Sequence, residues 1–259
     1  MKLMKLLSFL WLAGLLMAAL PATQSRAQDA DKIVRAMSDY LASVKTISLT
    51  YDTDIEVITP AIQKLQFASS GQVLLSRPNK LRATRVGGYA NVELVFDGNT
   101  LSMFGKNIDA LAQVPAEGSV DQLVHRLRDE FSIALPGASF LLSASYDELM
   151  TGVLDVQHIG RGVIDGVECE HLAFRNEDTD WQLWVEVGAK PIPRKYVITS
   201  KDVAAAPQYT LRIKEFHADV EHGADAFAFK APASAKKVEI TALSSLDEVP
   251  YGIVSGEKK

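Results

Sequence analysis

The spacing of the hydrophobic residues changes sharply near position 45, from the period of a helix to that of a strand. From residue 49 onward, apolar positions alternate with the acidic residues Asp52, Asp54 and Glu56. Before that point, over residues 29–44, the apolar positions form one helical stripe: Ile33, Val34, Met37, Tyr40, Leu41 and Val44. The pattern predicts an amphipathic helix over 29–44, followed at once by a strand with one apolar face.

Extended patterns continue to about residue 105, and two turn signals divide them. Residues 71–85 contain the turn Pro78-Asn79, and residues 91–104 contain Asp97-Gly98-Asn99. Glycine and asparagine tolerate the positive φ angles that tight hairpins require. We therefore expect successive antiparallel hairpins in this part of the chain.

A helical block interrupts the strands. Ser119 and Gln122 have the spacing of a capping box, which predicts that a helix starts here. Its apolar stripe is Leu123, Val124, Leu127 and Phe131. Pro136-Gly137 ends the helix, and residues 138–150 predict one or two further short helices rich in apolar side chains.

Strand patterns return near residue 153 and run to about residue 240. Asp165-Gly166 predicts a hairpin, and residues 188–193 predict a second reversal through glycine and proline. Residues 225–232, with Phe227 and Phe229, predict a last strand.

The segment "WQLWVEV", residues 181–187, combines strand alternation with unusual bulk. Trp181 lies on one side together with Leu183, Val185 and Val187, whereas Trp184 points to the other side. The pattern predicts one bulky apolar wall and a tryptophan on the opposite, outer face.

The order of these elements predicts an α+β fold that is mainly β. Each hairpin has one apolar face, and such a face needs a cover. We expect a curved antiparallel sheet that forms an incomplete (half) β-barrel, with helices over its concave face. Two separate α+β domains are the alternative interpretation.

The first 27 residues have the features of a secretory signal peptide. Lys2 and Lys5 precede an apolar run over 6–20, and Ser25-Arg26-Ala27 offers small residues to a signal peptidase. We expect a signal peptide at 1–27, a single domain at 28–241 and a polar, flexible tail at 242–259. The mature chain would be periplasmic; an uncleaved N-terminal anchor is the alternative.

The number of cysteines and the net charge exclude further classes of protein. Cys169 is the only cysteine, so the sequence offers no intrachain disulfide, no cysteine zinc cluster and no lipid anchor at the cleavage site. We expect it to be a packed, inert thiol. No later stretch is long and apolar enough to span a bilayer. A net charge of −5 argues against nucleic-acid binding.

Several stretches resemble a family of predicted periplasmic bacterial proteins that is classed as a domain of unknown function, family 2092. The most specific is "VIDGVECEHLAFRNEDTDWQLWVEVGAKPIPRKYVIT", and "PQYTLRIKEF" follows it. "VFDGNTLSMF" and "VDQLVHRLRDEFSIALPGASFLL" also fit. The resemblance covers most of the mature chain.

More distantly, the layout is similar to the LolA/LolB lipoprotein-carrier superfamily. The shared features are the early helix, the Asp-Gly-x-x-Leu hairpin, a strand ending "W-V-E", and a late "F-x-F-x-x-P" at Phe227, Phe229 and Pro232. This resemblance implies an incomplete barrel whose concave face holds lipid chains under a helical lid. The chain lacks the anchoring cysteine of the outer-membrane receptor.

Known catalytic motifs are absent from the sequence. It has no G-x-S-x-G, no H-E-x-x-H and no glycine-rich phosphate loop. The best metal candidate is "FHADVEH", where His217, Asp219 and Glu221 share one side of a strand and His222 lies across from them. A solvated strand end explains this segment as well. We expect a protein that is not an enzyme, with no cofactor and no metal; a metal-dependent hydrolase is the alternative.

The apolar inner face is the remaining candidate for a site. Either its side chains pack together as an ordinary core, or they line a cavity for one or two acyl chains. The candidate ligand-binding residues are Tyr51, Leu94, Phe96, Met103, Phe140, Leu141, Tyr146, Trp181, Leu183, Tyr196, Ile198, Tyr209 and Leu211.

These observations give two hypotheses of function. The first is a periplasmic binding or carrier protein for a lipid, a lipoprotein acyl chain or another hydrophobic ligand. The second is a cell-envelope sensor or module that binds a protein partner with the same fold, through a surface that includes Trp184.

Overall fold

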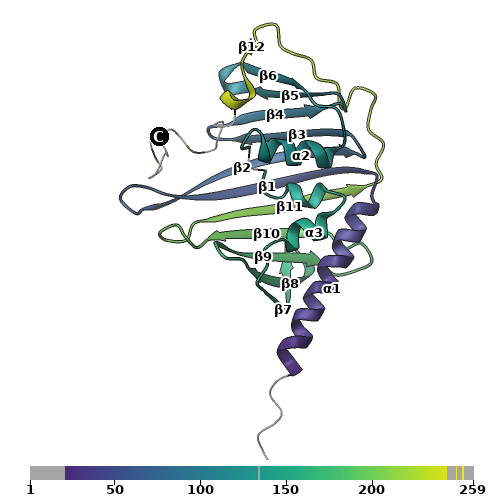
Figure 1. Ribbon diagram of the computed structural model, residues 1–259, viewed down its shortest axis with the longest axis vertical. Helices are drawn as coiled ribbons and strands as arrows, with labels where there is room; N and C mark the ends of the chain where they lie inside the picture. The colour runs from purple at the N-terminus through teal and green to yellow at the C-terminus, as the bar shows by residue number, and fades with distance from the viewer. Residues whose placement is uncertain (1–20, 134, 244–248, 250–252, 254–259) are drawn as a thin grey trace, which may run out of the picture.

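Twelve strands form one open, curved sheet in the described part of the chain. The structure is a computed structural model that describes residues 21–133 and 135–243 together with 249 and 253, and side chains from residue 27 onward. The strand order is β12-β6-β5-β4-β3-β2-β1-β11-β10-β9-β8-β7, and Figure 1 shows the strands stacked in this order from top to bottom. The sheet is therefore not closed into a barrel.

All neighbouring strands are antiparallel except β12 and β6, which run parallel. This last pairing differs from the fully antiparallel sheet that the sequence predicts. The strands are β1 (Thr46–Ile58), β2 (Lys64–Ser76), β3 (Lys80–Gly87), β4 (Asn91–Phe96), β5 (Thr100–Gly105), β6 (Ala110–Pro115), β7 (Asp155–Ile164), β8 (Val167–Arg175), β9 (Thr179–Glu186), β10 (Pro193–Ser200), β11 (Gln208–Ala218) and β12 (Lys236–Lys237).

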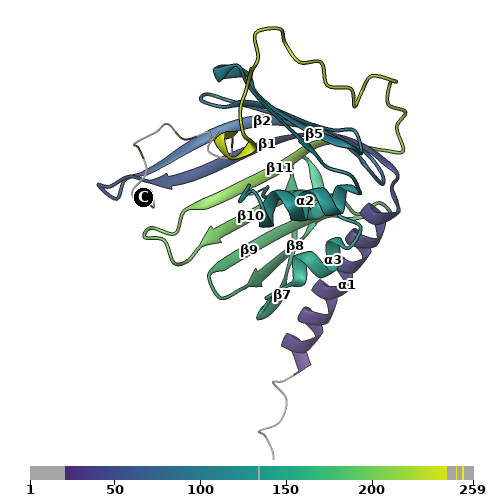
Figure 2. The same cartoon turned by 45° about the horizontal axis from the view of Figure 1, so that its top comes forward.

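The helices lie on one side of the sheet, which we call the inner face (Figure 2). α2 covers the half that contains β1–β6, whereas α1 and α3 cover the half that contains β7–β11. The helices are α1 (Pro21–Ser43), α2 (Val120–Asp129) and α3 (Ser145–Met150), with 3-10 turns η1 (Lys106–Ile108), η2 (Ala138–Leu141) and η3 (Ile240–Leu243).

Local sequence signals account for most of these boundaries. Ser119 caps α2 as predicted: its hydroxyl accepts from the Gln122 backbone N–H at 3.2 Å, and the Gln122 side chain accepts from the Ser119 N–H at 2.8 Å. The predicted hairpins at Asp97-Gly98 and Asp165-Gly166 are also present, with positive φ at Gly98, Asp165 and Gly166.

The predicted last strand over 225–232 is wrong. Backbone bonds from Ala226 to Gly223 and from Ala228 to Asp225 close two turns instead. The segment then crosses the outer face, where the Phe229 and Phe104 rings lie 6.2 Å apart. Phe227 and Phe229 therefore have the spacing of strand residues but lie in or next to turns. Their rings pack against apolar surface, and their backbone pairs with no strand among the described residues.

Strand β6 has no counterpart in the sequence prediction. Ala110, Leu111 and Ala112 are all buried, because the helices cover one face of β6 and the C-terminal segment covers the other. A strand that is buried on both faces shows no alternation of polar and apolar residues, so period two could not reveal it.

Both ends of the chain extend beyond the described part. The predicted boundary at 241 falls inside η3, where Ile240 and Leu243 are buried in the core. Most of the predicted tail and residues 1–20 of the predicted signal peptide lie outside the described residues, so both remain predictions. No helix among the described residues is long and apolar enough to cross a membrane.

Candidate functional site

The inner face contains all thirteen candidate ligand-binding residues, divided between two apolar clusters. The first cluster lies between β1–β6 and α2, and it includes Leu94, Phe96 and Met103, with Leu141 packed against it. The second lies between β8–β11, α1 and α3, and it contains Phe140, Trp181, Leu183 and Leu211, with Tyr146, Tyr196, Ile198 and Tyr209 packed against it. Tyr51 packs against both clusters.

The first cluster is closed by α2. The predicted stripe residues Leu123, Val124 and Leu127 are all buried there. They face strand residues of the same cluster, of which Phe96 and Leu101 are each only 1% exposed. This half of the inner face is packed as a hydrophobic core.

The second cluster is built around Trp181. Its ring stacks on Phe174 with centroids 3.6 Å apart and meets Tyr196 edge to face at 5.7 Å. The indole N–H donates to the Asn176 side-chain oxygen at 2.9 Å. Phe140 of η2 meets Tyr196 edge to face at 5.3 Å, so the helical cover reaches the aromatic wall directly.

One margin of the second cluster is only half-buried. We call Tyr51, Tyr196, Ile198 and Tyr209 the open margin, because these inner-face residues retain part of their exposure. Burial raises the pKa of Tyr196 to about 12, and it also raises the pKa of Tyr209. The two phenols are thus held in their neutral form, in which each hydroxyl can donate a hydrogen bond.

Polar contacts on the surface tie the covering helices together. The Tyr146 hydroxyl of α3 bonds to Asp31 of α1, and the Arg35 guanidinium lies 3.8 Å from the centre of the Tyr146 ring. Arg128 of α2 pairs with Glu148 of α3. The Arg128–Glu148 pair is exposed, and ion pairs of this kind contribute about 0–1 kcal/mol each.

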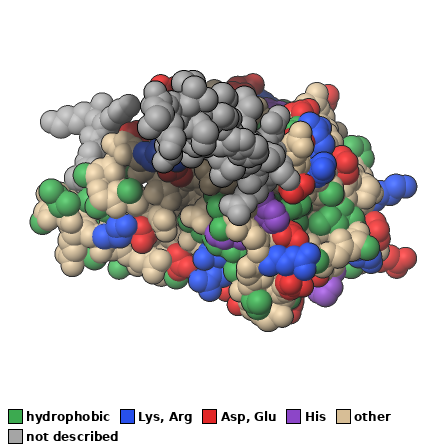
Figure 3. Space-filling view, turned by 90° about the horizontal axis from the view of Figure 1, so that it is seen from below, with side chains coloured by type: hydrophobic (Ala, Val, Ile, Leu, Met, Phe, Trp, Pro, Cys, Tyr) green, Lys and Arg blue, Asp and Glu red, His purple; other side chains and the backbone are tan. Residues whose placement is uncertain are grey.

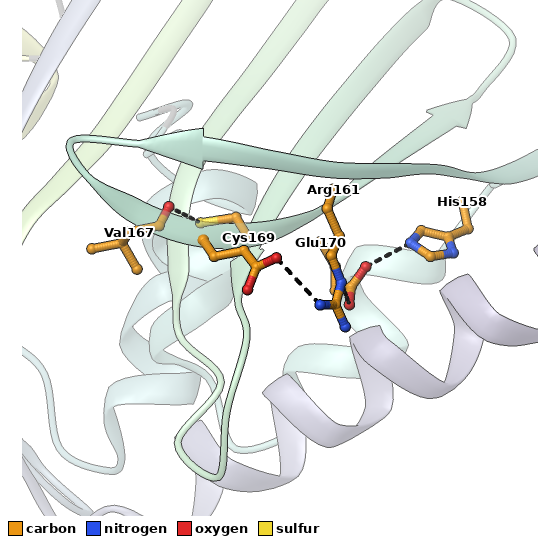
Figure 4. Close-up of polar contacts among 6 residues, drawn as sticks. His158, Arg161, Val167, Cys169 and Glu170 are labelled. Atoms are coloured by element: carbon orange, nitrogen blue, oxygen red, sulfur yellow. Dashed lines mark hydrogen bonds and ion pairs between the residues drawn. The ribbon is translucent and has the colours of Figure 1, made fainter.

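A charged group closes the inner face at the β7–β8 end, beside α1 (Figure 4). His158 Nε2 lies 2.8 Å from a Glu170 carboxylate oxygen, and Arg161 Nε donates to the other at 3.0 Å. Arg161 also pairs with Glu168 at 3.2 Å, and these carboxylates, Glu170 first, hold the pKa of Arg161 above its ordinary value. The apolar surface therefore ends at this polar rim.

The sequence of this chain matches a known protein family. A family model described as "Predicted periplasmic protein (DUF2092)" matches residues 30–241. The chain belongs to this family. The model covers both halves of the sheet and all thirteen candidate residues, and no curated protein matches the chain.

Some solved structures resemble this DUF2092 protein at low identity. An uncharacterized conserved protein from Thermus thermophilus is 12% identical, with a TM-score of 0.48 over 82% of this chain and 99% of its own. The Mycobacterium tuberculosis lipoprotein LppX is 14% identical, with a TM-score of 0.48 over 75% and 98%. A chain of the Pseudomonas aeruginosa MucA/MucB complex is 13% identical, with a TM-score of 0.42 over 81% and 63%. At these values, the similarities say nothing about what this DUF2092 protein binds.

The outer face of the DUF2092 sheet carries Trp184, as its alternation with Trp181 predicts. Its ring stacks on His171 with centroids 4.1 Å apart, and Lys195 Nζ lies 4.9 Å from its centre. His171 also lies 2.9 Å from the Gln182 side-chain oxygen. Trp184 is thus half-buried among polar neighbours on this surface.

His222, one of the histidines considered for a metal site, has other partners in the structure. His222 Nε2 lies 3.1 Å from the Leu75 carbonyl oxygen, and its ring meets Phe227 edge to face. A carbonyl oxygen can only accept, so this nitrogen carries a proton and has no lone pair for a metal. Among the described residues, no three His, Cys, Asp or Glu side chains form a group that could hold a metal ion.

Cys169 is fully buried, as predicted, and burial raises the pKa of its thiol. Its sulfur lies 3.5 Å from the Val167 carbonyl oxygen (Figure 4). A thiol with a raised pKa is poorly nucleophilic, which agrees with a packing role.

Two cavities are present away from the open margin. One of about 40 Å³ lies between α2 and the sheet, next to Phe96 and Leu123. The other, of about 230 Å³, lies on the outer face beneath the C-terminal segment, next to Glu93 and Phe229. An acyl-chain cavity on the inner face therefore remains a prediction.

Sequence reasoning missed the charged residues of the inner face, and Arg85 is an example. It lies two and four residues after Ala83 and Leu81, which pack in the first cluster, so it shares their face. The alternation in "KLRATRV" places Arg85 on the same face as Leu81 and Ala83. The signal was weak because most residues of this strand are charged or polar.

Proposed function

We propose that this protein binds a lipid or another hydrophobic ligand on the inner face of its sheet and carries it in the periplasm. The observation that supports this most is the open margin, where aromatic and aliphatic side chains lie half-buried beside a closed aromatic wall. The family description as a predicted periplasmic protein fits this setting.

The open margin has the chemistry that an acyl chain requires. Removing each CH₂ group from water contributes about 0.8 kcal/mol, so a chain of about twelve methylenes gains about 10 kcal/mol before the loss of its freedom is subtracted. Such a ligand needs few directed polar contacts. Aromatic side chains such as Trp181 and Tyr196 provide a large apolar contact area.

The helical cover offers a route for entry. α3 has only six residues and no side-chain cap at its start, and Leu149 is its buried apolar anchor in the second cluster. Its polar links to α1 and α2 are one contact each, made by Tyr146 and Glu148. We expect α3 to be displaced more easily than α2 when a ligand enters.

Native mass spectrometry of protein purified from its own periplasm, followed by organic extraction and lipid analysis, tests the proposal. We expect a stoichiometric adduct that extracts as a lipid. A mass equal to that of the polypeptide alone, unchanged after incubation with long-chain lipids, would contradict it.

A matched pair of variants localises the ligand. Ile198→Asp places a charge on the inner face, whereas Thr199→Asp places the same charge one residue later, on the outer face. We expect the first variant to lose the adduct and the second to keep it, with circular dichroism confirming that both are folded. Equal occupancy in the two variants would show that the ligand does not lie on the inner face.

The second candidate function is a module that binds an envelope protein through the outer face. Trp184 supports it, because tryptophan is enriched at interfaces and this one is stacked and held in place by His171. Pull-down from envelope extracts with the wild type and Trp184→Ala tests it. A partner that the wild type retains and the variant loses would favour this candidate, and equal recovery would exclude Trp184 from the contact.

Across the molecule as seen from the β7 side, no single type of side chain dominates. Figure 3 shows hydrophobic, acidic and basic side chains interspersed over this view. A surface of mixed charge gives little electrostatic attraction for a highly charged partner. Trp184 is therefore a more specific candidate than the general surface charge.

A further inference from the structure

Four side chains on neighbouring strands form one row across the outer face of the β7–β11 half. His171 of β8 lies opposite Trp184 of β9, and Trp184 lies opposite Lys195 of β10. Lys195 in turn lies opposite Arg212 of β11. Residues that are directly opposite each other project from the same face of a sheet, with Cβ atoms about 4.5–5.5 Å apart. We call these four residues the outer row.

The aromatic end of the outer row is held in a fixed position. The Trp184 ring lies within 11° of parallel to the His171 ring, and the Gln182 side-chain oxygen lies 2.9 Å from His171 Nε2. Because β8 and β10 flank β9, the ring stands between His171 and Lys195. Its indole N–H donates to no described residue and stays available to a partner.

The other end of the outer row is a pair of cations, Lys195 and Arg212, which we call the basic pair. Neither side chain forms an ion pair with a carboxylate in the part of the chain that the structure describes. Burial and then the charge of Arg212 lower the pKa of Lys195, and Asp54 offsets only part of this effect. Two like charges are thus held side by side, and a bound anion would relieve their repulsion.

The basic pair differs from the other cations of the same two strands. β10 and β11 contain four lysine and arginine residues. Arg194 pairs with Glu186 at 2.5 Å, and Lys214 pairs with Asp165 at 2.7 Å. The two cations without such a partner are the two that lie beside Trp184.

We propose that the outer row binds an acidic, extended segment of a protein partner. One aspartate or glutamate carboxylate of that segment is held by the basic pair, and an adjacent apolar side chain packs against Trp184. The inference rests on the second candidate function and names the chemistry of the partner; it does not require lipid binding. A guanidinium can donate two parallel hydrogen bonds to a carboxylate, and the ammonium group adds a further donor.

The acidic residues of β1 favour a peptide over a broad anionic surface. Asp52 lies opposite Arg212, and its carboxylate accepts from the Ser70 hydroxyl at 2.6 Å. Asp54 is two residues further along the same face. A membrane rich in phosphatidylglycerol would bring negative charge against both aspartates, and such like-charge contacts are unfavourable. A peptide can place a single carboxylate over the basic pair and avoid them.

A phage library of random short peptides, selected on the immobilised full mature chain, tests the inference. We expect the selected peptides to share an aspartate or glutamate next to an apolar residue. One of them is then synthesised together with a version in which the acid is replaced by its amide. Hydrogen bonds to charged groups change affinity by about tenfold or more, so we expect the amide version to bind at least about tenfold more weakly in calorimetry.

Variants then assign the preference to the basic pair. The double variant Lys195→Gln, Arg212→Gln should bind the acidic peptide as weakly as the amide version, with no further loss for the amide version itself. Lys214→Gln is the matched control, because it removes the same charge from the same face of β11 but from a cation that already has a partner. We expect it to change affinity by less than about twofold. Trp184→Ala should weaken both peptides.

The outcomes separate this inference from the second candidate function. Selected peptides without a shared acid, no selected peptide at all, or an equal loss of affinity in Lys214→Gln would each overturn it. Vesicles of phosphatidylglycerol that bind the wild type but not the double variant, with no peptide selected, would replace the peptide by a membrane. A pulled-down partner that Trp184→Ala loses and the double variant retains would overturn the acidic segment and keep the candidate function. If the double variant does not fold, Arg212→Gln alone decides the question.

Discussion

The two halves of the inner face are made from the same kind of strand but are covered in different ways. In the β1–β6 half, α2 has ten residues, a capping box and an apolar stripe that is completely buried. In the β7–β11 half, the cover consists of the long helix α1 and of α3, which has six residues and no side-chain cap, and residues packed against this cluster form the half-buried open margin.

The cover, more than the strand, decides whether an apolar face is closed as core or stays partly exposed. Leu94 and Phe96 of β4 alternate in the same way as Tyr196 and Ile198 of β10. The first pair is almost fully buried and the second pair is not.

Truncation of a large side chain should separate the halves most strongly. Phe96→Ala should lower the free energy of unfolding by about 3–5 kcal/mol, because it empties a closed core site. Lipid occupancy of the folded fraction should stay unchanged. Ile198→Ala should lower stability by less and reduce occupancy, as urea unfolding and native mass spectrometry would show. The reverse ranking would contradict the assignment of core and binding surface.

High pH should weaken the open-margin half through Tyr196. Its pKa is about 12 in the folded protein and about 10 in the unfolded chain, so the unfolded chain loses its proton first. The contribution of Tyr196 to stability is therefore complete below pH 10 and is lost as pH rises through 12. Between about pH 9 and about pH 11.5 the expected loss is about 2 kcal/mol. Tyr196→Phe should lose correspondingly less over this range; identical urea-unfolding profiles would contradict the assignment.

A methyl group at the seam between the halves should also be costly. Gly71→Ala places a Cβ against the Tyr51 ring and the Thr84 carbonyl, and should lower the free energy of unfolding by about 1–3 kcal/mol. Gly88→Ala is the control, because a Cβ there meets nothing within 4 Å. A difference of less than about 0.5 kcal/mol between the two variants, measured by thermal or urea unfolding, would mean that Tyr51 does not need this space.

The smallest effect on stability is expected at the ion pair between α2 and α3. Glu148→Gln removes the pair with Arg128 between α3 and α2, and should change the free energy of unfolding by less than about 1 kcal/mol. It should nevertheless speed the exchange of a bound fluorescent fatty acid. Asp129→Asn is matched, since it also removes a partner of Arg128 but lies on α2 itself. Equal exchange rates in both variants would exclude this link as part of the lid.

Sequence periodicity predicted the fold well wherever one face of an element was polar. The alternation from Leu49 to Val57, the cap at Ser119 and the opposite orientations of Trp181 and Trp184 all follow from local rules, and the structure agrees with them. Local rules suffice here because each of these elements has water on one side and the core on the other. Polar and apolar residues then repeat with the period of the helix or strand itself.

The failures have a common physical origin in contacts between distant segments. β6 was missed because the C-terminal segment covers its outer face, and Phe227 and Phe229 were mistaken for strand residues because they form part of that segment. The candidate residues lie in the two apolar clusters of the inner face, and their role in ligand binding stays a prediction. Which of them stay half-buried depends on how the distant helices α1, α2 and α3 cover the sheet, and the alternation within a strand carries no information on that.

The short pairing of β12 with β6 has a consequence for aggregation. An open sheet exposes two rows of unsatisfied backbone groups, and a fibril can grow only if copies add at both of them. Here Lys236 and Lys237 occupy part of one row and bring two positive charges to it, whereas β7 forms the opposite end of the sheet. Because lysine at a sheet edge disfavours the addition of another strand, edge-to-edge stacking of copies should be weaker at β12 than at β7.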